Sequence, residues 1–168
     1  MIKRFLNEHK TARAILWLVF LVYTAWILKI TVFRSDFGTH ELFSGEINWS
    51  IMHNYALIIG RGYPDIAAFY FFGNIGVFIP FGMLLVFLLD RPFRRGALEG
   101  FLFSLAIETA QFVFGVGFSE VDDLILNVTG VIIGWCLAAL IQNKLEKTLY
   151  PDGRAQSAED TGDNDDTR

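Results

Sequence analysis

Four long apolar runs constrain this chain more than any other feature of its sequence. They cover residues 14–33, 66–89, 97–115 and 124–142. A helix rises about 1.5 Å per residue, so runs of this length match a hydrocarbon core roughly 30 Å thick. Hydrophobic residues make up 53% of the 168-residue chain and charged residues 19%, which leaves too much apolar surface for a water-soluble domain of this size. We therefore predict an all-α membrane protein, a bundle of about four transmembrane helices.

The remaining residues exclude several classes of function. Lys and Arg form no basic stripe of the kind that binds nucleic acid, so no nucleic-acid partner is expected. The single cysteine, Cys136, lies inside an apolar run, which excludes an intramolecular disulfide. His40, Glu41 and His53 match no standard metal-binding spacing. The sequence therefore predicts no metal site and no cofactor.

The distribution of Lys and Arg predicts the orientation of the helices. Four of these residues lie in the N-terminal segment 1–13, three lie in the loop 90–96, and Lys144, Lys147 and Arg154 follow the fourth apolar run. The long loop 34–65 holds two, and the segment 115–123 holds none. Because cytoplasmic loops of membrane proteins carry an excess of Lys and Arg, both termini should be cytoplasmic and the long loop extracytoplasmic.

The predicted organisation has five parts. These are a basic cytoplasmic N-terminus (1–13), a first transmembrane helix (14–33), an extracytoplasmic loop (34–65), a core with three transmembrane helices (66–142) and a cytoplasmic tail (143–168). Within the loop, Ile47, Ile51, Tyr55 and Ile58 recur at helical spacing, which predicts a short interfacial helix. From about residue 151 the tail is polar and acidic, which predicts disorder.

Polar residues recur on one face of the later apolar runs. An ionisable side chain inside the bilayer costs a few kcal/mol, so it usually faces the protein interior and has a function. Glu108 and Gln111 share a face of the third run. Asp123 and Asn127 share a face of the fourth, and Asn74 lies in the second. The predicted topology brings these residues to similar depths in the outer leaflet, below the acidic segment that follows the third run. The predicted ligand-binding pocket comprises Asn74, Glu108, Gln111, Glu120, Asp122, Asp123 and Asn127.

Three glycines and a proline mark the expected helix contacts. Gly82, Gly130 and Gly134 let helices approach closely, because they place no side chain between the backbones. Pro80 lies within the second run, where it frees a backbone carbonyl and is expected to kink the helix. We expect these four residues to serve helix packing.

Three of these stretches, taken in order, resemble the VanZ-like family. They are 74–85 (NIGVFIPFGMLL), 104–111 with its Glu108, and 122–130 followed by Gly134. The ordered combination is specific and covers roughly residues 70 to 135. The resemblance implies a small bacterial cytoplasmic-membrane protein, in a family whose founding member is linked to resistance to the glycopeptide antibiotic teicoplanin. It implies no established catalytic residues.

Two positions depart from the family pattern. Family members often have an arginine where this chain has Gly117, and an aspartate is usual where this chain has Glu120. If that arginine pairs with the carboxylates or binds an anion, the activity of this chain is altered or lost.

Three functions stay open at this point. The leading hypothesis is a multi-pass protein of the bacterial cytoplasmic membrane whose polar pocket binds an envelope lipid, a lipid-linked glycan or a glycopeptide. The second is an intramembrane enzyme that uses Glu108 with Asp122 or Asp123 as acid and base, although no activated Ser or Cys nucleophile is evident. The third is a non-catalytic assembly partner that docks another membrane protein through Gly130, Gly134 and Ala138. A homo-oligomer is the other assembly left open.

Overall fold

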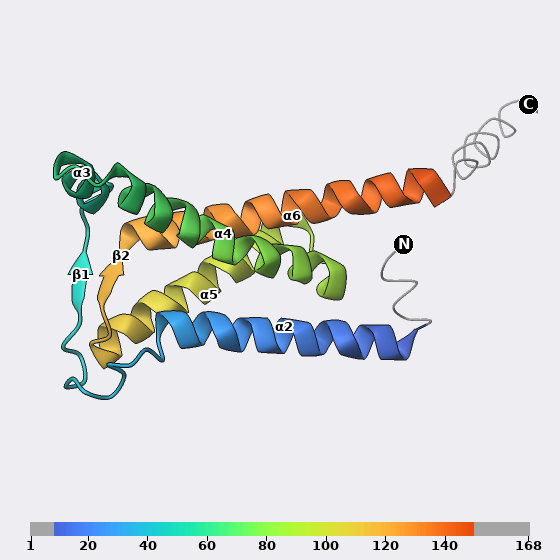
Figure 1. Cartoon of the computed structure of the whole chain (residues 1–168). Helices are drawn as coiled ribbons and strands as arrows, with labels where there is room; N and C mark the ends of the chain where they lie inside the picture. Colours follow the sequence, from blue (N-terminus) through green and yellow to red (C-terminus); the bar gives the residue numbers. More distant parts are fainter. Residues whose placement is uncertain (1–8, 150–168) are drawn as a thin grey trace, which may run out of the picture.

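The computed structural model describes residues 9–149, and four long helices dominate it (Figure 1). These helices are α2 (Lys10–Thr31), α4 (Pro64–Leu89), α5 (Phe93–Phe114) and α6 (Val121–Leu149). Each is long and apolar enough to cross a membrane. The predicted all-α membrane bundle of about four helices is confirmed, and the chain is a multi-pass membrane protein. The predicted disordered tail lies outside the described residues.

Helix α6 makes extensive contacts with two other long helices from one side of the bundle. It packs mainly against α4 and next against α5, whereas α2 touches α4 and α5 less extensively. In Figure 1, α2 and α6 run along opposite sides with α4 and α5 between them. The side chains of Leu18, Leu21 and Val22 on α2 are each at least 60% exposed. Much of the α2 surface is therefore available to lipid.

Two glycines of α6 set its distance from α4. The backbone of Gly130 lies against the carbonyl of Ile75, and that of Gly134 lies against the carbonyl of Ile79. A methyl group at either position would overlap a backbone oxygen of α4, which cannot rotate away as a side chain can. The GxxxG spacing therefore serves contact between two helices of the same chain.

A third close contact joins α4, α5 and α6 at one valine. Val131 of α6 is fully buried, with its backbone against Gly82 of α4 and its side chain against Gly100 of α5. Pro80 lies inside α4, which continues on both sides of it. The main core around this contact is apolar and includes Ile27, Phe78, Phe81, Leu85, Ile107 and Val131.

One end of the bundle is covered by two short strands and a short helix, which we together call the cap. Strand β1 (Glu46–Asn48) pairs in parallel with β2 (Phe118–Glu120), and α3 (His53–Gly60) follows. The sequence predicts a short helix in this loop, and α3 is that helix. However, Ile47, which the helical spacing had included, lies in β1.

The end of α5 explains why the loop is extended before β1. The last carbonyls of a helix lack partners inside the helix. Here the carbonyls of Phe112 and Val113 accept hydrogen bonds from the N–H groups of Gly45 (3.1 Å) and Phe43 (2.7 Å). These bonds hold the loop beside the end of α5. They place β1 next to β2, which begins at Phe118, shortly after α5 ends at Phe114. A second, small core of Tyr55, Ala67 and Leu126 then attaches α3 to α4 and α6.

Candidate functional site

Five polar side chains meet beneath the cap, and we call them the polar cluster: Asn54, Asn74, Glu108, Glu120 and Asp123. Asn74 Nδ2 donates a hydrogen bond to Asp123 Oδ1 at 2.5 Å, and Asn54 Nδ2 donates to Glu120 Oε1 at 2.7 Å. The backbone N–H of Glu120 donates to Glu108 Oε2 at 2.9 Å. The carboxyl groups of Glu108, Glu120 and Asp123 also lie close enough to interact electrostatically. The cluster thus joins α3, α4, α5, α6 and β2.

The carboxyl groups of this cluster have no cationic partner among the described residues. Within residues 9–149, the salt bridges join Arg34 to Asp36 and Arg91 to Glu99, and neither includes a residue of the cluster. The amide N–H groups of Asn54 and Asn74 satisfy only one oxygen each of Glu120 and Asp123. A carboxylate can accept several hydrogen bonds, so the carboxyl groups of the cluster retain capacity to accept more.

Asp122 adjoins the cluster but has a structural role. Its side chain is only 1% exposed, and both of its oxygens accept a hydrogen bond from the N–H of Met52, at 2.8 and 3.0 Å. Met52 has the left-handed conformation (φ 57°) that turns the chain into α3. Asp122 therefore fixes the start of α3 to the start of α6.

Tyr55 completes the site, although its role was not predicted from the sequence. It is a buried residue of α3, and its hydroxyl hydrogen-bonds with the side chain of Asn74. Burial raises the pKa of Tyr55 to about 12, and the carboxylates of Asp123 and Glu120 act in the same direction. The sequence signal for Tyr55 was its place on the apolar face of the predicted interfacial helix, which does not reveal a polar partner.

The raised pKa of Tyr55 predicts a loss of stability at alkaline pH. Between about pH 10 and 12 the phenol is ionised in the unfolded chain but neutral in the folded protein, so unfolding releases a proton. Stability should therefore fall as pH rises through this window, and Tyr55→Phe should reduce the fall. Thermal melts of both proteins in detergent from pH 9 to 12 measure this. Tyr70→Phe, on the exposed surface of α4, is the control, and parallel curves for wild type and Tyr55→Phe would contradict the prediction.

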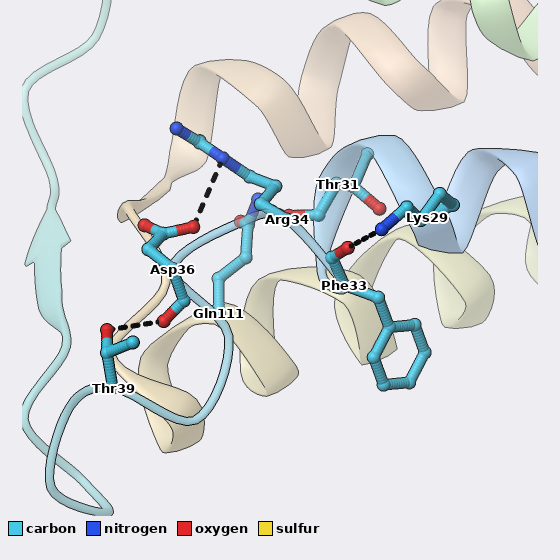
Figure 2. Close-up of polar contacts among 7 residues, drawn as sticks. All are labelled: Lys29, Thr31, Phe33, Arg34, Asp36, Thr39 and Gln111. Carbon is cyan, nitrogen blue, oxygen red and sulfur yellow. Dashed lines mark hydrogen bonds and ion pairs between the residues drawn. The ribbon is translucent and has the colours of Figure 1, made fainter.

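The structure places two more predicted pocket residues outside the cluster, in addition to Asp122. Asn127 Nδ2 donates to Ser104 Oγ at 3.0 Å, in a buried contact between α5 and α6. Gln111 Nε2 donates to the carbonyl of Thr31 at 3.3 Å, which joins α5 to the end of α2 (Figure 2). Both side chains link helices. The other four predicted pocket residues do lie together beneath the cap.

A polar hollow of about 300 Å³ lies on the cap beside the cluster. Its lining residues are Glu46, Ile47, Asn48, Asn54 and Phe118. Asn54 belongs to both the hollow and the polar cluster, because its amide nitrogen bonds Glu120. Among the residues that the structure describes, no three His, Cys, Asp or Glu side chains are arranged to hold a metal ion. Polar side chains thus line the hollow and connect it to the cluster.

Comparison with known proteins supplies the family. The family model described as VanZ/LLP1 matches residues 20–142, from within α2 to within α6. The chain belongs to the VanZ/LLP1 family. The resemblance that three sequence stretches indicated is thus confirmed, and the VanZ/LLP1 match extends it to the first helix.

One curated VanZ/LLP1 relative can be compared directly. Protein VanZ of Enterococcus faecium is 35% identical over 86 residues, which cover 45% of this chain and 51% of the relative. The match therefore spans about half the length of that relative. No solved structure matches the chain.

The structure also describes the surroundings of Gly117, where VanZ-like proteins often have an arginine. Gly117 has φ +90°, which favours glycine, and a Cβ atom there would lie 3.4 Å from Nη1 of Arg34. Arg34 comes from the loop after α2, and its Nε is 3.7 Å from Asp36 Oδ1 (Figure 2). A guanidinium group from another part of the chain thus lies next to position 117.

Proposed function

We propose that this VanZ-family protein binds a cell-envelope ligand through the polar cluster, in the outer leaflet of a bacterial cytoplasmic membrane. The observation that carries the proposal is the convergence of side chains from α3, α4, α5, α6 and β2 on carboxyl groups that have no cationic partner in the described part of the chain. A network that served only to join helices would gain little from three neighbouring carboxyl groups. A ligand with donor groups would satisfy their remaining oxygens.

The arrangement of basic residues supports an outward-facing cap. The loop between α4 and α5 lies at the end of the bundle opposite the cap (Figure 1). It leads into Arg94 and Arg95, which are exposed, and contains Arg91. Since Lys and Arg accumulate on the cytoplasmic side, this end is cytoplasmic in our proposal, and the polar cluster faces the envelope.

Envelope molecules with polar donor groups are the ligands that we propose. They include lipid head groups, lipid-linked glycans and lipoglycopeptides. The family resemblance extends the proposal to protection against glycopeptide antibiotics such as teicoplanin. The alternative of docking another membrane protein through Gly130 and Gly134 has less support, because both glycines lie against α4 and are covered by it.

The proposal predicts that cluster variants lose protection against teicoplanin and lipoglycopeptides. Bacteria would express the wild type, Glu108→Gln and Asp123→Asn at matched membrane levels. We expect the wild type to raise the inhibitory concentration and both variants to lose most of this effect, because each removes a carboxylate acceptor from the cluster.

Asp65→Asn is the matched control for this experiment. Asp65 is an exposed acidic residue in the first turn of α4, away from the cluster, so this variant should protect as the wild type does. Full protection by both cluster variants would contradict a role for the cluster. No protection by the wild type would contradict the glycopeptide part of the proposal.

A further inference from the structure

An apolar groove of about 390 Å³ lies between α3 and the first turns of α4, next to the polar cluster. Its walls include Met52, Tyr55 and Ala56 on one side and Ala67, Ala68 and Phe71 on the other. Except for the hydroxyl of Tyr55, the side chains that line it have no hydrogen-bonding group. Water inside such a groove would lack partners, whereas a hydrocarbon chain would not need them.

The position of the groove along α4 places it across the edge of the membrane. The 26 residues of α4 extend about 39 Å, which exceeds the roughly 30 Å of the hydrocarbon core. The groove involves the segment 64–72, the first two to three turns. With α4 centred in the bilayer, the end of the groove near Pro64 would lie at the level of lipid head groups, and the end near Phe71 at the level of the chains.

Tyr55 connects this groove to the polar cluster. Its ring lines the groove and packs edge-on against Phe71, with 5.8 Å between the ring centroids. Its hydroxyl hydrogen-bonds with Asn74, which in turn donates to Asp123. A molecule with its chain in the groove would therefore hold its polar end beside Asn74 and Asp123.

The chemistry of the cluster selects the kind of polar end. Asn54 and Asn74 already direct their N–H groups to carboxyl oxygens, so the groups left for a ligand are mainly acceptors. Three neighbouring carboxyl groups without a cation in the described part of the chain favour a positively charged donor. A primary ammonium group meets both requirements.

We propose that the groove holds a hydrocarbon chain of a membrane lipid whose primary ammonium head group binds the polar cluster. This inference rests on the proposed function, which assigns ligand binding to the cluster, and it adds the class of ligand and the place of its chain.

Lipid retention tests this proposal. The protein would be equilibrated in vesicles of chain-matched phosphatidylethanolamine, phosphatidylcholine and phosphatidylglycerol in equal amounts, extracted in mild detergent, and examined by native mass spectrometry. The first two lipids differ in whether the ammonium group can donate hydrogen bonds. We expect the wild type to retain phosphatidylethanolamine over phosphatidylcholine by roughly tenfold, as hydrogen bonds to charged groups allow. Equal retention of these two lipids would overturn the assignment of the head group, as would a preference for the hydroxyl-bearing phosphatidylglycerol.

Variants that fill the groove test the place of the chain. Ala68→Trp should abolish retention of all three lipids, while Phe69→Trp, on the neighbouring exposed position outside the groove, should retain them as the wild type does. Ala56→Trp with Leu57→Trp provides the same pair on α3, and melting curves show which variants fold. Undiminished retention in folded Ala68→Trp or Ala56→Trp would overturn the groove assignment.

One further variant separates this inference from the proposed function. Asp123→Asn should keep lipid in the groove but lose the preference for phosphatidylethanolamine. If Asp123→Asn loses antibiotic protection while the groove variants retain lipid normally, the proposed function stands and the groove assignment fails. If Asp123→Asn changes neither protection nor lipid preference, both fail.

Discussion

A Gly134→Ile variant is expected to lose the folded bundle. A Cβ atom at position 134 would overlap the carbonyl of Ile79 and lie 3.0 Å from the backbone nitrogen of Met83, so α4 would have to move away from α6. These two helices make the most extensive contact in the protein. Overpacking a core typically costs about 1–3 kcal/mol, and backbone atoms cannot relieve it by changing rotamer. We expect little or no monodisperse protein in size-exclusion chromatography.

Gly76→Ile is the control for this substitution. Gly76 lies in α4, is exposed, and has no neighbouring atom within 4 Å of the position that its Cβ would take. The same side chain should therefore be tolerated there, with a melting temperature close to that of the wild type. Equal behaviour of the two variants would show that the α4–α6 spacing is not fixed by Gly134.

Asp122→Ala is expected to release the start of α3. The substitution removes the buried carboxylate that accepts the Met52 N–H and holds this residue in its left-handed conformation. A hydrogen bond to a charged group contributes about 2 kcal/mol, which corresponds to roughly thirtyfold faster local opening. Hydrogen exchange followed by mass spectrometry on peptides that cover residues 50–60 measures this change directly.

The same experiment on Asp65→Ala provides the comparison, because Asp65 is exposed at the start of α4 and takes no part in the hydrogen bonds between Asp122 and Met52. Exchange in residues 50–60 should then remain as in the wild type. If Asp122→Ala also leaves exchange unchanged, the carboxylate does not hold α3 in place.

The sequence predicted the helices and much of the site because these depend on local periodicity. The four apolar runs that are long enough to span a membrane correspond to α2, α4, α5 and α6. Residues spaced three or four apart share a helix face, and the predicted topology placed Asn74 and Glu108, which lie in two different runs, at one depth. The glycines of the fourth run were expected to serve close helix packing, and they lie against α4.

The rest of the site depends on contacts between distant segments, which periodicity does not reveal. A strand of three residues is too short to show a hydrophobic pattern. Strand β1 pairs with β2, and the two membrane-spanning helices α4 and α5 separate these strands in the sequence. Because that pairing could not be predicted, Asp122 was interpreted as a ligand-binding carboxylate. In the structure, it accepts a hydrogen bond from the Met52 N–H. Likewise, nothing in the sequence indicated that Gln111 would turn to Thr31, or that Tyr55 would reach Asn74.

The parallel pairing of β1 with β2 has a consequence for biosynthesis. Glu46 pairs with Phe118, and α3, α4 and α5 are all made between them. Ribosomes add roughly 5–20 residues per second, so the first loop reaches its side of the membrane several seconds before its strand partner exists. During that interval, Asp122 is also absent, so α3 has no anchor on α6. Until then, the nascent loop would be open to proteases and chaperones. Synthesis of β2 and the start of α6 would end that exposure.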